Sequence, residues 1–185
     1  VIFLQNSSEL RPGGGFVGSY ADAAISGGNL EKTEIKDINE PDRELKLKII
    51  PPKPLQLITT RWKAADANWF FDFSDSAAKV VSFLEASEFY RSRQIIFEGG
   101  LGVSPSVISD LLSLTGSIEL KDYGVIIDQR NFLSEIQKEI QESQAKGASR
   151  PKKILEELTP LLIEKLSRLG SEETGKFFTF LENWL

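Results

Sequence analysis

The sequence predicts a mixed α/β fold, with α+β as the alternative, in which helices flank a mixed central β-sheet. A strand-like hydrophobic pattern runs through residues 1–50, and a helical pattern runs from residue 74 to the end. The length of 185 residues suits one sizeable core and would be cramped for two. We therefore expect a single layered domain over residues 1–185, β-rich over 1–50 and helix-rich over 74–185.

The β-rich part contains four segments with the features of strands. The opening VIFL is a short apolar run, typical of a strand buried on both faces. The pair Gly27-Gly28 favours a tight hairpin, and ELKLKII alternates until PPKP stops it, because proline cannot donate to a ladder. The expected strands are residues 1–4, 16–26, 29–38 and 44–50, and residues 51–68 are expected to form a loop.

The helix-rich part begins at Ser74, a suitable N-cap residue. A second helix is expected from Ser104 and Pro105 to Gly116, because proline suits the first helical turn and glycine suits the left-handed position after the last. Pro160 is expected to kink or divide a later helix. The other expected elements are short strands at 95–97, 118–120 and 125–127, and helices within 130–147, 152–170 and 176–185.

Composition excludes several classes of function. The net charge of −5 argues against a nucleic-acid partner, because no overall positive field offsets phosphate repulsion. Histidine and cysteine are both absent, which excludes Ser-His-Asp triads, disulfides and metal sites built from those residues. Chemistry must therefore come from carboxylates, Arg, Lys, Ser, Thr or Tyr.

One candidate site lies in QNSSELRPGGGFVGSY, residues 5–20. Glycines allow backbone N–H groups to converge on an anion, and Arg11 beside residues 13–15 offers a planar fork for phosphate or carboxylate. The alternative is a strand connection in which Arg11 pairs with a carboxylate such as Glu9 or Asp22.

A second candidate lies in RWKAADANWFFDFSDS, residues 61–76. Asp66 and Asp72 are oxygen ligands of the kind that Mg²⁺ prefers, Asn68 is a possible third, and the aromatic residues suit a groove for lipid or sugar. The alternative is turn chemistry combined with core packing. We expect the Arg11 loop to lie within reach of residues 66–72, with both lining one cleft.

Four segments together resemble a bacterial family of unknown function over nearly the whole chain. They are FLQNSSELRPGGGFVGSYA, ADANWFFDFSDSAAKV, VSPSVISDLLSLTGSIEL and PKKILEELTPLLIEKL, in this order. The resemblance implies an N-terminal membrane anchor ahead of residue 1 and a location on the extracytoplasmic face of the bacterial membrane.

The chain is also remotely similar to the LytR-CpsA-Psr family, which transfers lipid-linked glycopolymers onto the cell wall. That similarity implies that Arg11 corresponds to an arginine that binds the lipid pyrophosphate. It also places Pro41 and Asp42 where that family has a proline-arginine-aspartate motif, although here the arginine is displaced to Arg43.

Two functions remain as alternatives. The first is a domain that binds an anionic lipid-linked glycan or polyprenyl pyrophosphate, with phosphotransferase activity left open. The second is a non-catalytic envelope scaffold or protein-interaction module. For the first, the expected ligand-binding residues are Arg11, Gly13, Gly14, Arg61, Asn68 and Trp69, and the expected Mg²⁺ ligands are Asp66 and Asp72.

Overall fold

A computed structural model describes residues 1–6, 9–27, 29–147 and 153–184, and it confirms the mixed α/β class. The chain divides into two compact units, residues 1–104 and residues 105–185. Its buried side chains form two hydrophobic clusters, where the sequence predicted a single core. That both units belong to one domain stays a prediction.

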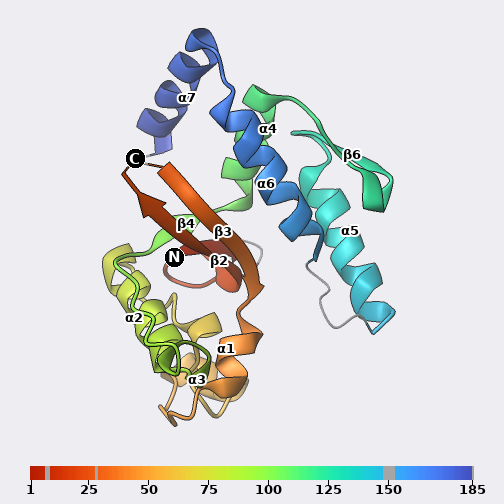
Figure 1. The fold of residues 1–185 in the computed structure, drawn as a ribbon. Helices are drawn as coiled ribbons and strands as arrows, with labels where there is room; N and C mark the ends of the chain where they lie inside the picture. Colours follow the sequence, from red (N-terminus) through yellow and green to blue (C-terminus); the bar gives the residue numbers. More distant parts are fainter. Residues whose placement is uncertain (7–8, 28, 148–152, 185) are drawn as a thin grey trace. The chain divides into compact units, whose positions relative to one another are not determined.

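The first unit is built on a four-stranded mixed sheet (Figure 1). In the sheet order β3-β2-β1-β4, the first two pairings are antiparallel, and β4 runs parallel to β1. Gly27 in the β2–β3 turn has a φ of 56°, as the hairpin expectation requires, while Gly28 lies outside the described residues. The strands are β1 Ile2–Asn6, β2 Phe16–Ser26, β3 Asn29–Asp37 and β4 Leu101–Val103.

Short and long helices gather on one side of this sheet (Figure 1). They are α1 Asn39–Glu44, the 3-10 helices η1 Lys53–Leu57 and η2 Ala64–Asp66, α2 Phe73–Ala86 and α3 Glu88–Arg91. The first cluster joins strand residues such as Phe3 and Val17 to Val80, Phe83 and Leu84 of α2. Burying such apolar side chains supplies the main force that holds the helices to the sheet.

The described residues of the second unit form four α-helices, a 3-10 helix and a two-stranded hairpin. Its cluster includes Leu112, Ile127, Ile136 and Leu158, which come from four different elements. No helix in the described ranges is long and apolar enough to cross a bilayer. The elements are α4 Pro105–Thr115, β5 Ile118–Leu120, η3 Lys121–Tyr123, β6 Val125–Ile127, α5 Phe132–Ala145, α6 Lys153–Ser167 and α7 Ser171–Trp184.

Two expected strands are wrong. Residues 44–50 end α1 and then continue as irregular chain, because their carbonyl groups accept hydrogen bonds from Arg61 and Trp62 instead of from a strand. Residues 95–97 are not a strand either; the sheet is completed by β4, four residues further on. The Phe73 ring packs closely over β4, since a Cβ on Gly102 would lie 2.8 Å from the ring and would force it to shift.

Helix ends were predicted with mixed success. Pro105 begins α4, and Gly116 follows it with a φ of 76°, as expected. The N-cap of α2 is Asp72, whose carboxylate accepts from the amides of Ser74 and Asp75, so Ser74 is not the cap. Residue 160 does not divide α6, which continues through it. The last helix begins five residues earlier than expected, and its predicted end at residue 185 lies outside the described residues.

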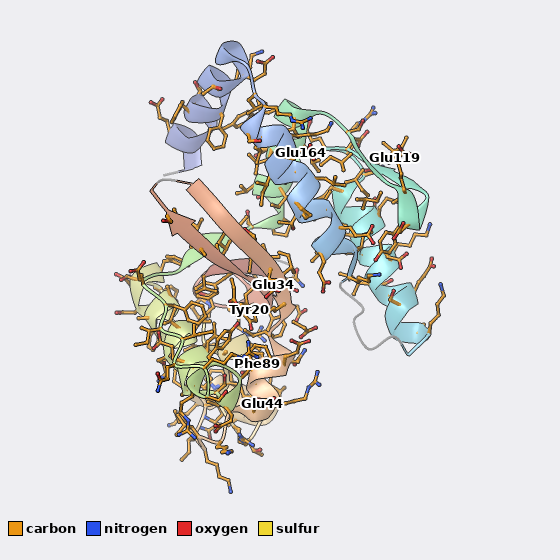
Figure 2. The ribbon with its side chains drawn as sticks, viewed as in Figure 1. Tyr20, Glu34, Glu44, Phe89, Glu119 and Glu164 are labelled. Atoms are coloured by element: carbon orange, nitrogen blue, oxygen red, sulfur yellow. The ribbon has the colours of Figure 1, made fainter. Side chains whose placement is uncertain are left out.

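A buried polar cluster joins the sheet to α3. The hydroxyl oxygens of Tyr20 and Tyr90 lie 2.6 Å apart, and the Tyr90 hydroxyl donates to both carboxylate oxygens of Asp22 at 2.9 Å. Asp22 is also paired with Lys36. Figure 2 labels Tyr20 on β2 and Phe89, the neighbour of Tyr90, on α3, the two elements that this cluster joins. Burial raises the pKa of both tyrosines, so both remain protonated donors.

Tyr90→Phe is expected to lower the free energy of unfolding by about 1.5–3 kcal/mol, because it removes a hydrogen bond to a charged, half-buried carboxylate. Tyr20→Phe removes only a bond between neutral hydroxyls, and we expect about 1 kcal/mol. Urea unfolding of both variants measures the difference. Equal losses would contradict the assignment of Tyr90 as the donor to Asp22.

Candidate functional site

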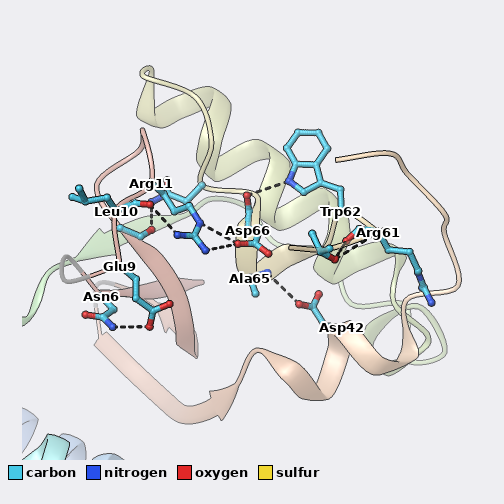
Figure 3. A network of polar contacts seen from close by, with 12 residues as sticks. Asn6, Glu9, Leu10, Arg11, Asp42, Arg61, Trp62, Ala65 and Asp66 are labelled. Carbon is cyan, nitrogen blue, oxygen red and sulfur yellow. Dashed lines mark hydrogen bonds and ion pairs between the residues drawn. The ribbon is translucent and has the colours of Figure 1, made fainter. Parts of the chain in front are cut away.

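The loop between β1 and β2 meets the segment that precedes α2 through an ion pair. Arg11 donates from Nη2 and Nε to Oδ1 of Asp66, at 2.7 and 3.0 Å (Figure 3). The two side chains are only 13% and 17% exposed. The prediction that the Arg11 loop lies within reach of residues 66–72 is thus confirmed, and that both line one cleft stays a prediction. The partner is neither Glu9 nor Asp22, the carboxylates suggested by the structural alternative.

Gly13 and Asn68 make a second contact between the same two segments. The Asn68 side chain is buried and donates from Nδ2 to the carbonyl oxygen of Gly15 at 2.8 Å. A Cβ on Gly13 would lie 2.0 Å from Oδ1 of Asn68 and 2.8 Å from Oγ of Ser76. Glycine is therefore required at residue 13 by packing against the Asn68 amide.

The backbone amides of the glycine run are used within the protein. The N–H of Gly13 donates to the carbonyl of Asn68 at 3.2 Å, and the N–H of Gly14 donates to the carbonyl of Arg11 at 3.0 Å. Gly14 and Gly15 have φ values of 109° and 145°, a backbone region that favours glycine. An anion at this loop would have to displace these hydrogen bonds to reach the two amides.

Asp66 is positioned by the short helix η2 and by Trp62. The indole Nε1 of Trp62 donates to the main-chain oxygen of Asp66 at 3.1 Å, and the amide of Asp66 donates to the carbonyl of Lys63 at 3.2 Å. The Trp62 ring is buried and packs edge-on against Phe83 of α2. The core therefore holds the turn that presents the Asp66 carboxylate to Arg11.

Asp42 of α1 anchors the start of the same turn. It is 3% exposed, and its two carboxylate oxygens accept from the amides of Ala64 and Ala65 at 2.8 and 3.2 Å (Figure 3). Burial raises the pKa of Asp42 from 3.8 to about 6, against the lowering effect of these two amides. Asp42 thus connects α1 to η2, and through Asp66 to the Arg11 loop.

Asp42 was not among the residues expected at the site, although one signal for it exists. Ile38, Asp42 and Leu45 are spaced i, i+4 and i+7, which places the acid on the buried face of a short helix. The alternation of residues 44–50, typical of a strand, begins within this spacing and masks it.

Three of the expected site residues serve elsewhere. Arg61 lies beyond Asp66 and points away from Arg11 in Figure 3, and its guanidinium donates to the carbonyls of Leu45 and Leu47. Trp69 is half-buried against the first cluster. Asp72 caps α2. Arg11 and Arg61, both expected to bind one ligand, therefore bond to different parts of the first unit.

Both carboxylates expected to hold Mg²⁺ have partners within the protein. A guanidinium lies against Oδ1 of Asp66, and the helix amides engage Oδ1 of Asp72. In the described part of the chain, no group of three or more acidic side chains is placed to hold a metal ion. The arrangement of Asp66 and Asp72 does not fit a magnesium site.

The chain matches a known protein family over most of its length. The family described as a protein of unknown function, DUF4012, matches residues 1–140, which covers the first unit and reaches into α5. The chain belongs to the DUF4012 family. No curated protein and no solved structure matches the chain. Both motif regions that meet at the ion pair lie inside the matched range.

Asp42 is expected to make stability depend on pH. Because its pKa is raised on folding, its contribution is fully present below pH 3.8 and is lost as the pH rises through about 6. The unfolding free energy of the wild type relative to Asp42→Asn should therefore fall by about 2–3 kcal/mol between pH 4 and pH 7. Urea unfolding across this range measures it, and a constant difference would contradict the raised pKa.

Asp72→Ala is expected to lower the unfolding free energy by about 1 kcal/mol, because it removes the N-cap of α2. Asp75→Ala, in the first turn of the same helix, is the control; it removes only a favourable interaction with the helix dipole and should cost about 0.3–1 kcal/mol. Thermal melts with and without millimolar Mg²⁺ should show the same difference between variants. A Mg²⁺-dependent rise in melting temperature in the wild type that disappears in Asp72→Ala would support the metal role instead.

Proposed function

We propose that this chain is a non-catalytic module of the bacterial cell envelope, in which the Arg11 loop fixes the fold instead of holding a pyrophosphate. The single observation that carries the proposal is the ion pair of Arg11 with Asp66. The arginine expected to bind the phosphate and one carboxylate expected to bind the metal neutralise each other. A phosphotransferase needs both groups turned toward its substrate and metal.

The surrounding contacts support the same proposal. The amides of residues 13 and 14 bond to protein carbonyls, and the side chain of Asn68 is buried with its Nδ2 engaged. Rearranging the loop around an anion would break several hydrogen bonds at once, each worth about 0.5–1.5 kcal/mol. The placement in the envelope, with a membrane anchor ahead of residue 1, rests on the sequence resemblance described above.

The second candidate remains an anionic lipid-linked ligand that displaces Asp66 from Arg11. The observation in its favour is the remaining exposure of both side chains, through which a phosphate could approach. Inorganic pyrophosphate is the appropriate probe, because it carries the charged group of such a ligand without the lipid chain.

Arg11→Ala is expected to lower the unfolding free energy by about 2–3 kcal/mol, because it leaves Asp66 half-buried without its counter-ion. The control is Arg91→Ala, whose exposed pair with Glu88 should contribute less than about 1 kcal/mol. Urea unfolding measures both variants.

Calorimetric titration of the wild type with pyrophosphate, with and without Mg²⁺, completes the test. The proposal expects no saturable binding. Binding that Arg11→Ala weakens at least about tenfold while stability stays unchanged would overturn it in favour of the anionic ligand.

A further inference from the structure

The loop that follows α1, residues 45–63, has a charge unlike that of the rest of the chain. It carries five basic residues and no acidic one. The whole chain has a formal charge of −5, so the residues outside this loop sum to −10. Any anionic surface that approaches the protein is therefore repelled by the remainder and attracted by this loop. The basic residues are Lys46, Lys48, Lys53, Arg61 and Lys63.

The same loop exposes large aliphatic side chains. Leu57 is 90% exposed, Ile50 is 77% exposed, Ile58 is 73% exposed and Leu47 is 47% exposed. Single exposed apolar residues are ordinary on protein surfaces, but several within one short basic loop are not. Lysine and aliphatic residues that alternate in this way combine a charge and an apolar surface at one place.

The loop is held in shape by its own anchors. Leu55 is buried in the first cluster, the amide of Trp62 donates to the carbonyl of Ile49 at 2.8 Å, and the Gln56 side chain donates to the carbonyl of Pro51 at 2.8 Å. Arg61 donates to the carbonyls of Leu45 and Leu47, closing the loop near its start. Its apolar side chains therefore stay exposed on an ordered backbone, so binding through them carries little ordering cost.

We propose that the 45–63 loop docks on an anionic lipid bilayer surface. The aliphatic side chains enter the boundary between headgroups and acyl chains, and the lysines lie against the lipid phosphates. A nucleic acid would match the lysines but would gain nothing from exposed leucine and isoleucine, which have no aromatic ring to stack on a base. The loop residues are separate from Arg11 and Asp66, so this inference does not depend on the role of the ion pair.

Vesicle co-sedimentation of the 185-residue chain tests the proposal. One vesicle preparation contains phosphatidylcholine alone, and the other contains phosphatidylcholine and phosphatidylglycerol at about two to one. We expect clear preference for the anionic vesicles, reduced by added salt. Absence of binding, or equal binding to both preparations, would overturn the proposal and leave an acidic protein partner as the occupant of this surface.

Two pairs of variants separate the charged and apolar contributions. Lys48→Gln with Lys53→Gln should reduce partitioning about twentyfold or more, since each lysine near the surface contributes about fivefold. Leu57→Ser with Ile58→Ser should reduce it at least about tenfold. The matched controls are Lys121→Gln with Lys138→Gln, and Ile25→Ser, which change exposed residues outside the loop.

The controls should bind as the wild type does, and all variants should keep its melting temperature because the changed side chains are exposed. Losses in the controls as large as those in the loop variants would overturn the proposal. Retained vesicle binding in both loop variants would also overturn it, whatever the pyrophosphate titration shows.

Discussion

The ion pair between Arg11 and Asp66 is the interaction on which the loops of the first unit depend. It joins segments 55 residues apart, and it neutralises two charges that are mostly removed from solvent. Leaving one of these charges without its counter-ion would cost about 2–3 kcal/mol, so the ion pair helps to hold the two segments together. Because the two segments lie this close, residue 13 must be glycine: the Asn68 amide occupies the space that a Cβ would need.

The same constraint extends to Asp42, whose carboxylate holds the amides of the turn that presents Asp66. A protein without histidine or cysteine would need residues such as carboxylates and arginine for catalysis. Here two carboxylates and one arginine instead connect α1, η2 and the Arg11 loop. A glycine-rich loop with an arginine has the composition of an anion site, yet its first two amides bond to protein carbonyls. Composition specifies which groups are present, and their partners determine what those groups can do.

Positive charge gathers in the 45–63 loop. Its exposed lysines and aliphatic side chains lie on a backbone fixed by Leu55, Trp62 and Arg61. The net charge of the whole chain conceals this difference, because −10 outside the loop outweighs the positive charge within it. The sign of a local surface therefore carries more information about partners than the sum over the chain.

The sequence was enough for the features that depend on neighbouring residues. Pro105 and Gly116 marked the ends of α4, and the glycine pair marked the β2–β3 hairpin, because caps and turns follow from local backbone preferences. It also indicated that the Arg11 loop and the 66–72 segment meet.

Other features needed the tertiary structure. Residues 44–50 alternate like a strand, but their carbonyls bond to Arg61 and Trp62. Strand β4 is only three residues long, with a glycine at its centre, which is too short to show a pattern. Two questions depended on which groups the folded chain brings within 3 Å. One is whether Arg11 faces a ligand or Asp66, and the other is whether Asp72 binds a metal or caps α2. Which atoms bond to each other across 55 residues is set by the packing of the whole unit, and no local pattern records it.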